Sequence, residues 1–144
     1  MSGSKRSGDV GVGRSPVLRW HFPSSAAAVG RMRQELDTAL SRLDASGDSH
    51  DAVLLVANEL AANAVEHGDG EVDVRATFSD GSVRIAVSDA SPDPPRIRPP
   101  SLSALRGRGL RVIDGLATRW SWSADSTGKT VWAEVPTDGG LGGR

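Results

Sequence analysis

The chain has 144 residues and a net charge of −1, with 38% hydrophobic and 24% charged residues. This length suits one domain with a single core, and the balanced charge gives no general attraction to nucleic acid or to a membrane. The absence of cysteine excludes disulfides, thiolate zinc sites and cysteine nucleophiles. No apolar run reaches the ~18 residues of a membrane span. The absence of cysteine fits a reducing compartment, and we expect a cytoplasmic protein.

The first half of the chain predicts one strand and two helices. Residues 1–15 are rich in Gly and Ser and are expected to form a disordered tail ahead of a domain at 16–137. Alternation over 17–22 predicts a strand, after which Ser24 or Ser25 caps a helix at 25–43. Residues 51–67 give the strongest helix prediction, with Asp51 in the first turn and Gly68 after the end.

The second half predicts two hairpins separated by a loop and a helix. Residues 71–78 and 83–89 alternate around an SDGS turn, and 119–124 and 130–135 form a second strand pair. Between them, 91–101 is Pro-rich and fits neither helix nor strand, and 107–117 opens a helix after glycines. We therefore expect an α+β two-layer sandwich, with a mixed, mostly antiparallel sheet and helices on one face. The end, 138–144, is expected to be a flexible tail.

A polar stripe crosses the otherwise apolar helix at 51–67. Glu59, Asn63 and Glu66 are spaced at i, i+4 and i+7, and burial of such groups requires partners. An Asn carbonyl oxygen can ligate magnesium beside substrate phosphates, and a Glu one turn away can accept a proton. The spacing is equally compatible with an exposed polar face. His67 either reaches a phosphate or is an ordinary helix-end histidine, and Glu66 fits a rim position.

Three further segments carry candidate ligand-binding groups. Asp89 ends a strand and can accept a hydrogen bond from an amino group such as that of adenine, although it also fits an ordinary turn. Gly107-Arg108-Gly109-Leu110 opens a helix, where glycines and the helix N-terminus suit phosphate. Thr130 offers a hydroxyl nearby, or simply begins the last strand.

These segments occur in the order and spacing of a known family. ELAANAVEHG (59–68), VSDASPDPP (87–95), GRGLRVID (107–114) and GKTVWAEV (128–135) together resemble the GHKL superfamily of histidine-kinase-like ATPases. The resemblance covers roughly residues 17–136 and is nearest to the anti-sigma-factor serine/threonine kinases of actinobacteria. It departs from the family's DxGxG pattern after Asp89, where the residues are Ala90, Ser91, Pro92 and Asp93 and no glycine is present.

The resemblance implies a fold and a set of roles. Expected are the Bergerat ATP-binding fold, ATP and Mg²⁺ as cofactors, Glu59 as general base and Asn63 as metal ligand. Asp89 would bind adenine with Thr130 beside it, and the segment at 107–110 would wrap the phosphates under a lid formed by 90–106.

Two functions follow from these roles. In the first, the protein is a homodimeric kinase that sequesters a sigma factor and phosphorylates a STAS-type anti-anti-sigma partner. The exposed face of the first helix, at Arg31, Arg33 and Gln34, is a candidate contact surface. In the second, it is a catalytically silent ATP-binding or partner-sequestering module. A histidine-kinase fragment is disfavoured, because no helix pair carries a phosphorylatable histidine.

Overall fold

A computed structural model describes residues 16–43, 47–95 and 109–137 of the chain. The elements follow the predicted order of strand, two helices, hairpin, helix and hairpin. They are β2 (Val17–Phe22), α1 (Ala26–Arg42), α2 (Gly47–His67), β3 (Val72–Ser79), β4 (Ser82–Asp89), α3 (Gly109–Leu116), β5 (Arg119–Asp125) and β6 (Gly128–Pro136). The tails at 1–15 and 138–144, and residues 96–108 of the expected lid, lie outside the described residues.

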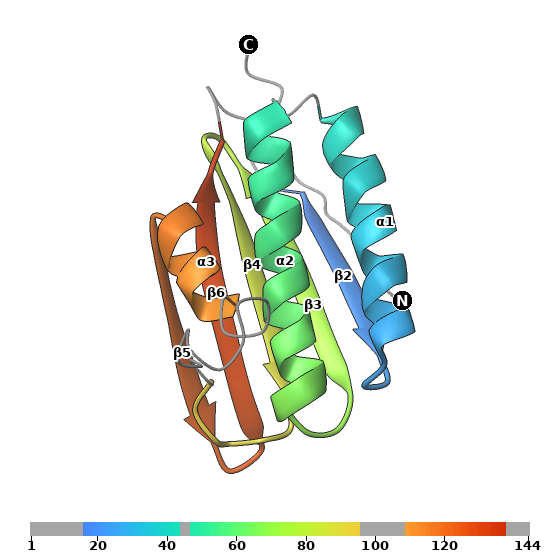
Figure 1. The fold of residues 1–144 in the computed structure, drawn as a ribbon, viewed down its shortest axis with the longest axis vertical. Coiled ribbons are helices and arrows are strands. Elements are labelled where there is room, and N and C mark those ends of the chain that lie inside the picture. The colour runs from blue at the N-terminus through green and yellow to red at the C-terminus, as the bar shows by residue number, and fades with distance from the viewer. Residues whose placement is uncertain (1–15, 44–46, 96–108, 138–144) are drawn as a thin grey trace.

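The five strands form one sheet in the order β2-β3-β4-β6-β5, and the helices pack against one of its faces (Figure 1). This confirms the predicted two-layer sandwich. All four pairings among the described strands are antiparallel. The pairs β3–β4 and β5–β6 are hairpins, whereas longer connections join β2 to β3 and β4 to β6. In the second hairpin, β6 pairs with β4, so β5 lies at the edge of the sheet.

Helix α1 begins as its sequence predicts. Ser25 has extended backbone angles, and its hydroxyl accepts a hydrogen bond from the Ala28 backbone N–H at 3.3 Å. This satisfies one of the unpaired amide groups at the helix N-terminus. Of the two serines that the sequence offered, Ser25 is therefore the cap.

Helix α2 begins at Gly47 rather than at Asp51, so the predicted start was wrong. Asp48 lies in the first turn, where the helix dipole stabilises a carboxylate, and Ser49 is buried. Burial of Ser49 helps to override the weak helix propensity of Gly, Asp and Ser.

The core lies between the helices and the sheet, and α2 runs across its centre (Figure 1). The predicted apolar stripe of α2 is buried as expected and comprises Val53, Val56, Ala57, Leu60 and Ala64. It meets the helix-facing side chains of β3, β4 and β6, which alternate with residues on the open face. Among the described helices, none has the length and apolar character required to cross a membrane.

Candidate functional site

Three elements meet at one end of the sheet. The C-terminal end of α2, the end of β4 and the β5–β6 hairpin lie together there (Figure 1). The backbone N–H of Ala90 donates to the Asp69 carbonyl oxygen at 2.7 Å, so the segments that follow β4 and α2 are joined directly. The predicted Asp89 lies at this junction.

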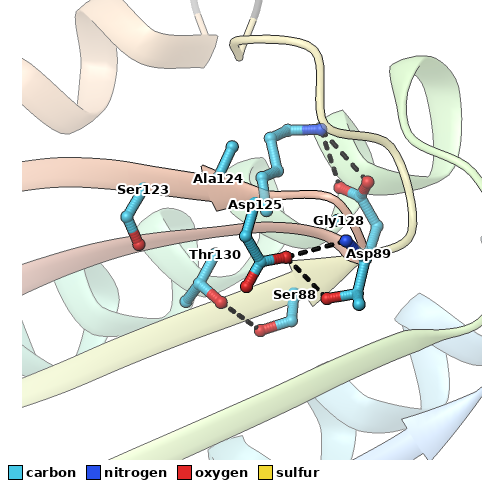
Figure 2. A pocket seen from close by; sticks show the side chains of 9 residues that line it. Ser88, Asp89, Ser123, Ala124, Asp125, Gly128 and Thr130 are labelled. Carbon is cyan, nitrogen blue, oxygen red and sulfur yellow. Dashed lines mark hydrogen bonds and ion pairs between the residues drawn. The ribbon is translucent and has the colours of Figure 1, made fainter.

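Asp89 forms a buried ion pair with Lys129 (Figure 2). The Lys129 Nζ donates to both carboxylate oxygens, at 3.1 Å to Oδ1 and 2.9 Å to Oδ2. The backbone N–H of Ser91 also donates to Oδ1, at 2.7 Å. The side chains of Lys129 and Asp89 are only 5% and 2% exposed. Burial of a carboxylate without such partners would be strongly disfavoured, so the lysine and the Ser91 N–H offset the cost of burying this side chain.

Backbone packs closely against Asp89 because two neighbouring residues are glycines. A Cβ at Gly68 would lie 2.5 Å from Asp89 Cγ and 2.6 Å from its Oδ2. Gly128 has a φ of +148°, and a Cβ there would collide with the Asp89 carbonyl oxygen. The end of α2 and the β5–β6 hairpin therefore approach Asp89 more closely than any side chain would permit.

A cavity of about 540 Å³ opens at this end of the sheet. Its lining comes from β4, β5, β6 and the hairpin turn, and comprises Ser88, Asp89, Ser123, Ala124, Asp125, Thr127, Gly128, Lys129 and Thr130 (Figure 2). Three of these are hydroxyl residues paired across neighbouring strands, with Thr130 between Ser88 and Ser123. The Ser88 and Thr130 hydroxyls are hydrogen-bonded at 2.7 Å. The cavity therefore offers donors and acceptors suited to a polar ligand.

At the hairpin turn, Asp125 is stabilised as a carboxylate. Its Oδ1 accepts hydrogen bonds from the Thr127 hydroxyl at 2.6 Å and from the Thr127 backbone N–H at 2.8 Å. These bonds favour the charged form and lower the pKa of Asp125 from its ordinary value. The turn therefore presents a fixed negative charge at the cavity edge.

The polar stripe of α2 lies apart from the residues that line this cavity. Glu59, Asn63 and His67 are half-buried, whereas Glu66 is exposed, as its predicted rim position requires. The His67 Nε2 lies 3.6 Å from the Glu66 carboxylate. Within the described ranges, no group of three or more His, Asp or Glu side chains could hold a metal ion. The amide oxygen of Asn63 nonetheless fits a magnesium ion whose other ligands are phosphates and water.

Thr130 and Asp89 both line this cavity. Strand alternation places the Thr130 side chain with Ser88 on the open face of the sheet, whereas Asp89 and Lys129 lie on the helix-facing side. The side chain that contacts Asp89 from β6 is Lys129.

Sequence reasoning missed Lys129, although a signal was present. Val131, Ala133 and Val135 alternate on the core-facing side of β6, and Lys129 continues that series. A lysine on a core-facing position requires an acidic partner. Asp89, which continues the equivalent series on β4, is its cross-strand neighbour.

Of the predicted phosphate segment, Gly107 and Arg108 lie outside the described residues. Gly109 and Leu110 form the start of α3, which agrees with a helix that opens at the glycines.

Comparisons with known proteins identify the fold. The family model described as "Histidine kinase-like ATPase domain" matches residues 22–135. The RsbU and RsbW domains of Rv1364c from Mycobacterium tuberculosis match with a TM-score of 0.66 and 20% identity, over 88% of this chain and 34% of that one. The chain thus spans about a third of that protein.

A histidine kinase domain from the blue-light-activated kinase EL346 of Erythrobacter litoralis also matches. Its TM-score is 0.48 at 22% identity, over 79% of this chain and 61% of that one. None of the curated proteins compared with the chain matches it significantly.

Proposed function

The chain belongs to the histidine kinase-like ATPase family, and from this premise we propose that it binds Mg-ATP and acts as an anti-sigma-factor-type protein serine/threonine kinase. In this proposal the protein sequesters a sigma factor and phosphorylates a STAS-type anti-anti-sigma partner. The observation that carries the proposal is the family match over 22–135, which includes Glu59, Asn63 and Asp89 in one continuous domain.

The proposed roles follow from the chemistry of each side chain. Glu59 accepts the proton of the partner's serine or threonine hydroxyl as that hydroxyl oxygen attacks the γ-phosphorus of ATP. The bond from that phosphorus to the β,γ-bridging oxygen breaks, giving ADP and a phosphorylated partner. Asn63 holds Mg²⁺, which when bound offsets phosphate charge. Positioning and charge stabilisation supply most of the rate in such transfers.

The partner assignment is supported by the sequence pattern and by the kind of protein that shares the fold. The matched M. tuberculosis structure contains an RsbU domain and an RsbW domain in one protein. We propose that the chain acts as a homodimer. We also propose that Arg31, Arg33 and Gln34, all exposed on α1, contribute to partner contact.

A binding experiment tests the nucleotide site. Magnesium-dependent ATP binding to the full chain is measured by calorimetry for wild type, Asn63→Ala and Asn58→Ala. Asn58 is a matched control, because it lies on the same helix and accepts a hydrogen bond from Arg33 at 3.1 Å. We expect Asn63→Ala to lose binding and Asn58→Ala to retain it. Absence of Mg-ATP binding in wild type would refute the proposal.

A transfer experiment tests the kinase. With γ-labelled ATP and candidate STAS-domain proteins, we expect label on the partner from wild type and a loss of at least 100-fold with Glu59→Gln. ATP binding that is unchanged in Glu59→Gln would assign that loss to chemistry rather than to binding.

One observation favours a second candidate, a silent ATP-binding module. The segment Ala90-Ser91-Pro92-Asp93 after Asp89 lacks the glycines of the family's DxGxG pattern, and the Ser91 N–H donates to the Asp89 carboxylate. A segment held in this way disfavours closure over a nucleotide. Mg-ATP binding without transfer to any partner would support this alternative.

A further inference from the structure

Lys129 is a charged residue in the cavity to which the proposed roles give no part. It lies on the helix-facing side of β6, directly opposite Asp89 in the β4–β6 register. We propose that Lys129 determines nucleobase specificity by letting the site accept 6-oxopurine nucleotides as well as adenine nucleotides. The inference rests on the proposed nucleotide-binding function and concerns which bases that site can read.

The first step is a count of hydrogen-bonding capacity. A carboxylate offers about four lone-pair positions, and an ammonium group offers three donors. On Asp89, Oδ1 accepts from both Lys129 Nζ and the Ser91 N–H, and Oδ2 accepts from Lys129 Nζ. These three bonds therefore leave one acceptor position on Oδ2 and one donor on Nζ unused.

The second step compares this pair with purine edges. Adenine presents an amino donor at position 6 beside the N1 acceptor, whereas a 6-oxopurine presents the O6 acceptor beside an N1–H donor. A lone carboxylate offers only acceptors, so it pairs with the adenine amino group and repels O6. A carboxylate beside an ammonium group can satisfy both edges. With adenine, the amino group donates to the carboxylate and N1 accepts from the ammonium group. With a 6-oxopurine, N1–H donates to the carboxylate and O6 accepts from the ammonium group.

The third step concerns the position of the lysine. Nine-tenths or more of each side chain is buried, and the Nζ contacts both carboxylate oxygens. Gly68 brings backbone against the Asp89 carboxylate, which limits its movement, and Gly128 packs against the Asp89 main chain. Separating the pair would leave an uncompensated buried charge. The Nζ is therefore held on the Asp89 carboxylate, and both residues contribute to the lining of the cavity.

The test compares nucleotides on the full chain in the presence of Mg²⁺. Dissociation constants for ATP and ITP are measured by calorimetry for wild type, Lys129→Thr and Lys129→Arg. ITP is the probe because it differs from ATP at the 6 position and N1 and has no 2-amino group. We expect ITP to bind wild type within about tenfold of ATP, since both edges are satisfied. Lys129→Thr should raise the ITP-to-ATP ratio of dissociation constants at least tenfold relative to wild type. Lys129→Arg should keep this ratio near the wild-type value.

A second measurement needs no variant and keeps the inference testable if Lys129→Thr does not fold. 1-Deaza-ATP lacks the N1 acceptor but keeps the amino group. If Lys129 donates to N1, this analogue should bind wild type at least fivefold more weakly than ATP.

The outcomes separate this inference from the proposed function. ATP binding with ITP more than about 100-fold weaker, or with a ratio unchanged in Lys129→Thr, would overturn the inference alone. Equal binding of ATP and 1-deaza-ATP would do the same. Failure of every nucleotide to bind wild type would overturn the proposed function and the inference with it.

Discussion

At the scale of single residues, the candidate site depends on the missing side chain of a glycine as much as on the side chains that are present. Gly68 follows α2 directly, and its backbone N–H donates to the Ala64 carbonyl oxygen at 2.9 Å, as a helix end requires. Its missing Cβ leaves the space that the Asp89 carboxylate occupies. One glycine thus ends the helix and seats the acidic side chain.

We predict that Gly68→Ala destabilises the protein by about 1–3 kcal/mol, because the added methyl group overpacks against the Ala64 carbonyl and the Asp89 carboxylate. Gly30→Ala is the matched control. Gly30 lies within α1, and a Cβ added there would meet nothing within 4 Å. Alanine there should stabilise by about 0.5–1 kcal/mol. Urea unfolding measures both changes, and a neutral Gly68→Ala would contradict the packing described for Asp89.

A second prediction concerns the energy of the buried pair. Lys129→Met should lower the free energy of unfolding by about 3–5 kcal/mol at pH 7, because Asp89 is left buried without its cation. Arg19→Met provides the comparison, since Arg19 pairs with Asp73 at 3.1 Å with a side chain that is 59% exposed. Its loss should cost less than about 1 kcal/mol. Similar costs for the two variants in urea unfolding would argue against a dominant buried pair.

At the scale of elements, one acidic residue joins three strands. On the open face, Glu134 of β6 lies between its register partners Arg84 of β4 and Arg119 of β5. Its carboxylate accepts from Arg119 Nε at 2.8 Å and from Arg84 at 2.9 Å. The Arg84 guanidinium also stacks 4.0 Å from the centre of the Trp132 ring. This cluster secures the second hairpin to the rest of the sheet.

The pH dependence of this cluster can be predicted. The hydrogen bond from Arg119, with that from Arg84, lowers the pKa of Glu134 against the opposing effect of burial. A depressed folded-state pKa contributes stability at pH values above the unfolded value of about 4.3, and this is lost as pH falls through the folded value. Glu134→Gln should therefore cost about 1 kcal/mol or less at pH 7, with a difference that shrinks below about pH 4.

Urea unfolding from pH 3 to pH 7 checks this prediction. The wild type and Glu134→Gln are compared at each pH. A difference between them that stays constant down to pH 3 would contradict a role for the ionised carboxylate.

Much of the element pattern could be predicted from sequence, because alternation and helical spacing record which side chains face the core. The contacts between side chains on neighbouring strands were harder to predict. Thr130 and Lys129 are adjacent, and only the β4–β6 register shows that Lys129 contacts Asp89. The start of α2 was misplaced because burial of Ser49 depends on contacts that local propensity does not record.

At the scale of the whole molecule, ligand binding and global stability are linked. We predict that Mg-ATP at 100 times its dissociation constant raises the free energy of unfolding by about 2.7 kcal/mol, because the ligand binds only the folded chain. Asn63→Ala should lose this gain and Asn58→Ala should keep it. Thermal unfolding with and without Mg-ATP measures the effect, and equal gains in both variants would remove Asn63 from the site.

The position of β6 in the sheet has a consequence for synthesis on the ribosome. β6 follows β5 in the chain yet lies between β5 and β4. A nascent chain that has emerged only as far as β4 therefore has an unpaired inner strand edge, and its Asp89 lacks Lys129. Such an edge can pair with another chain. The edge is covered, and Asp89 contacts Lys129, only after the final hairpin has been synthesised. The candidate site is therefore among the last features of the domain to assemble.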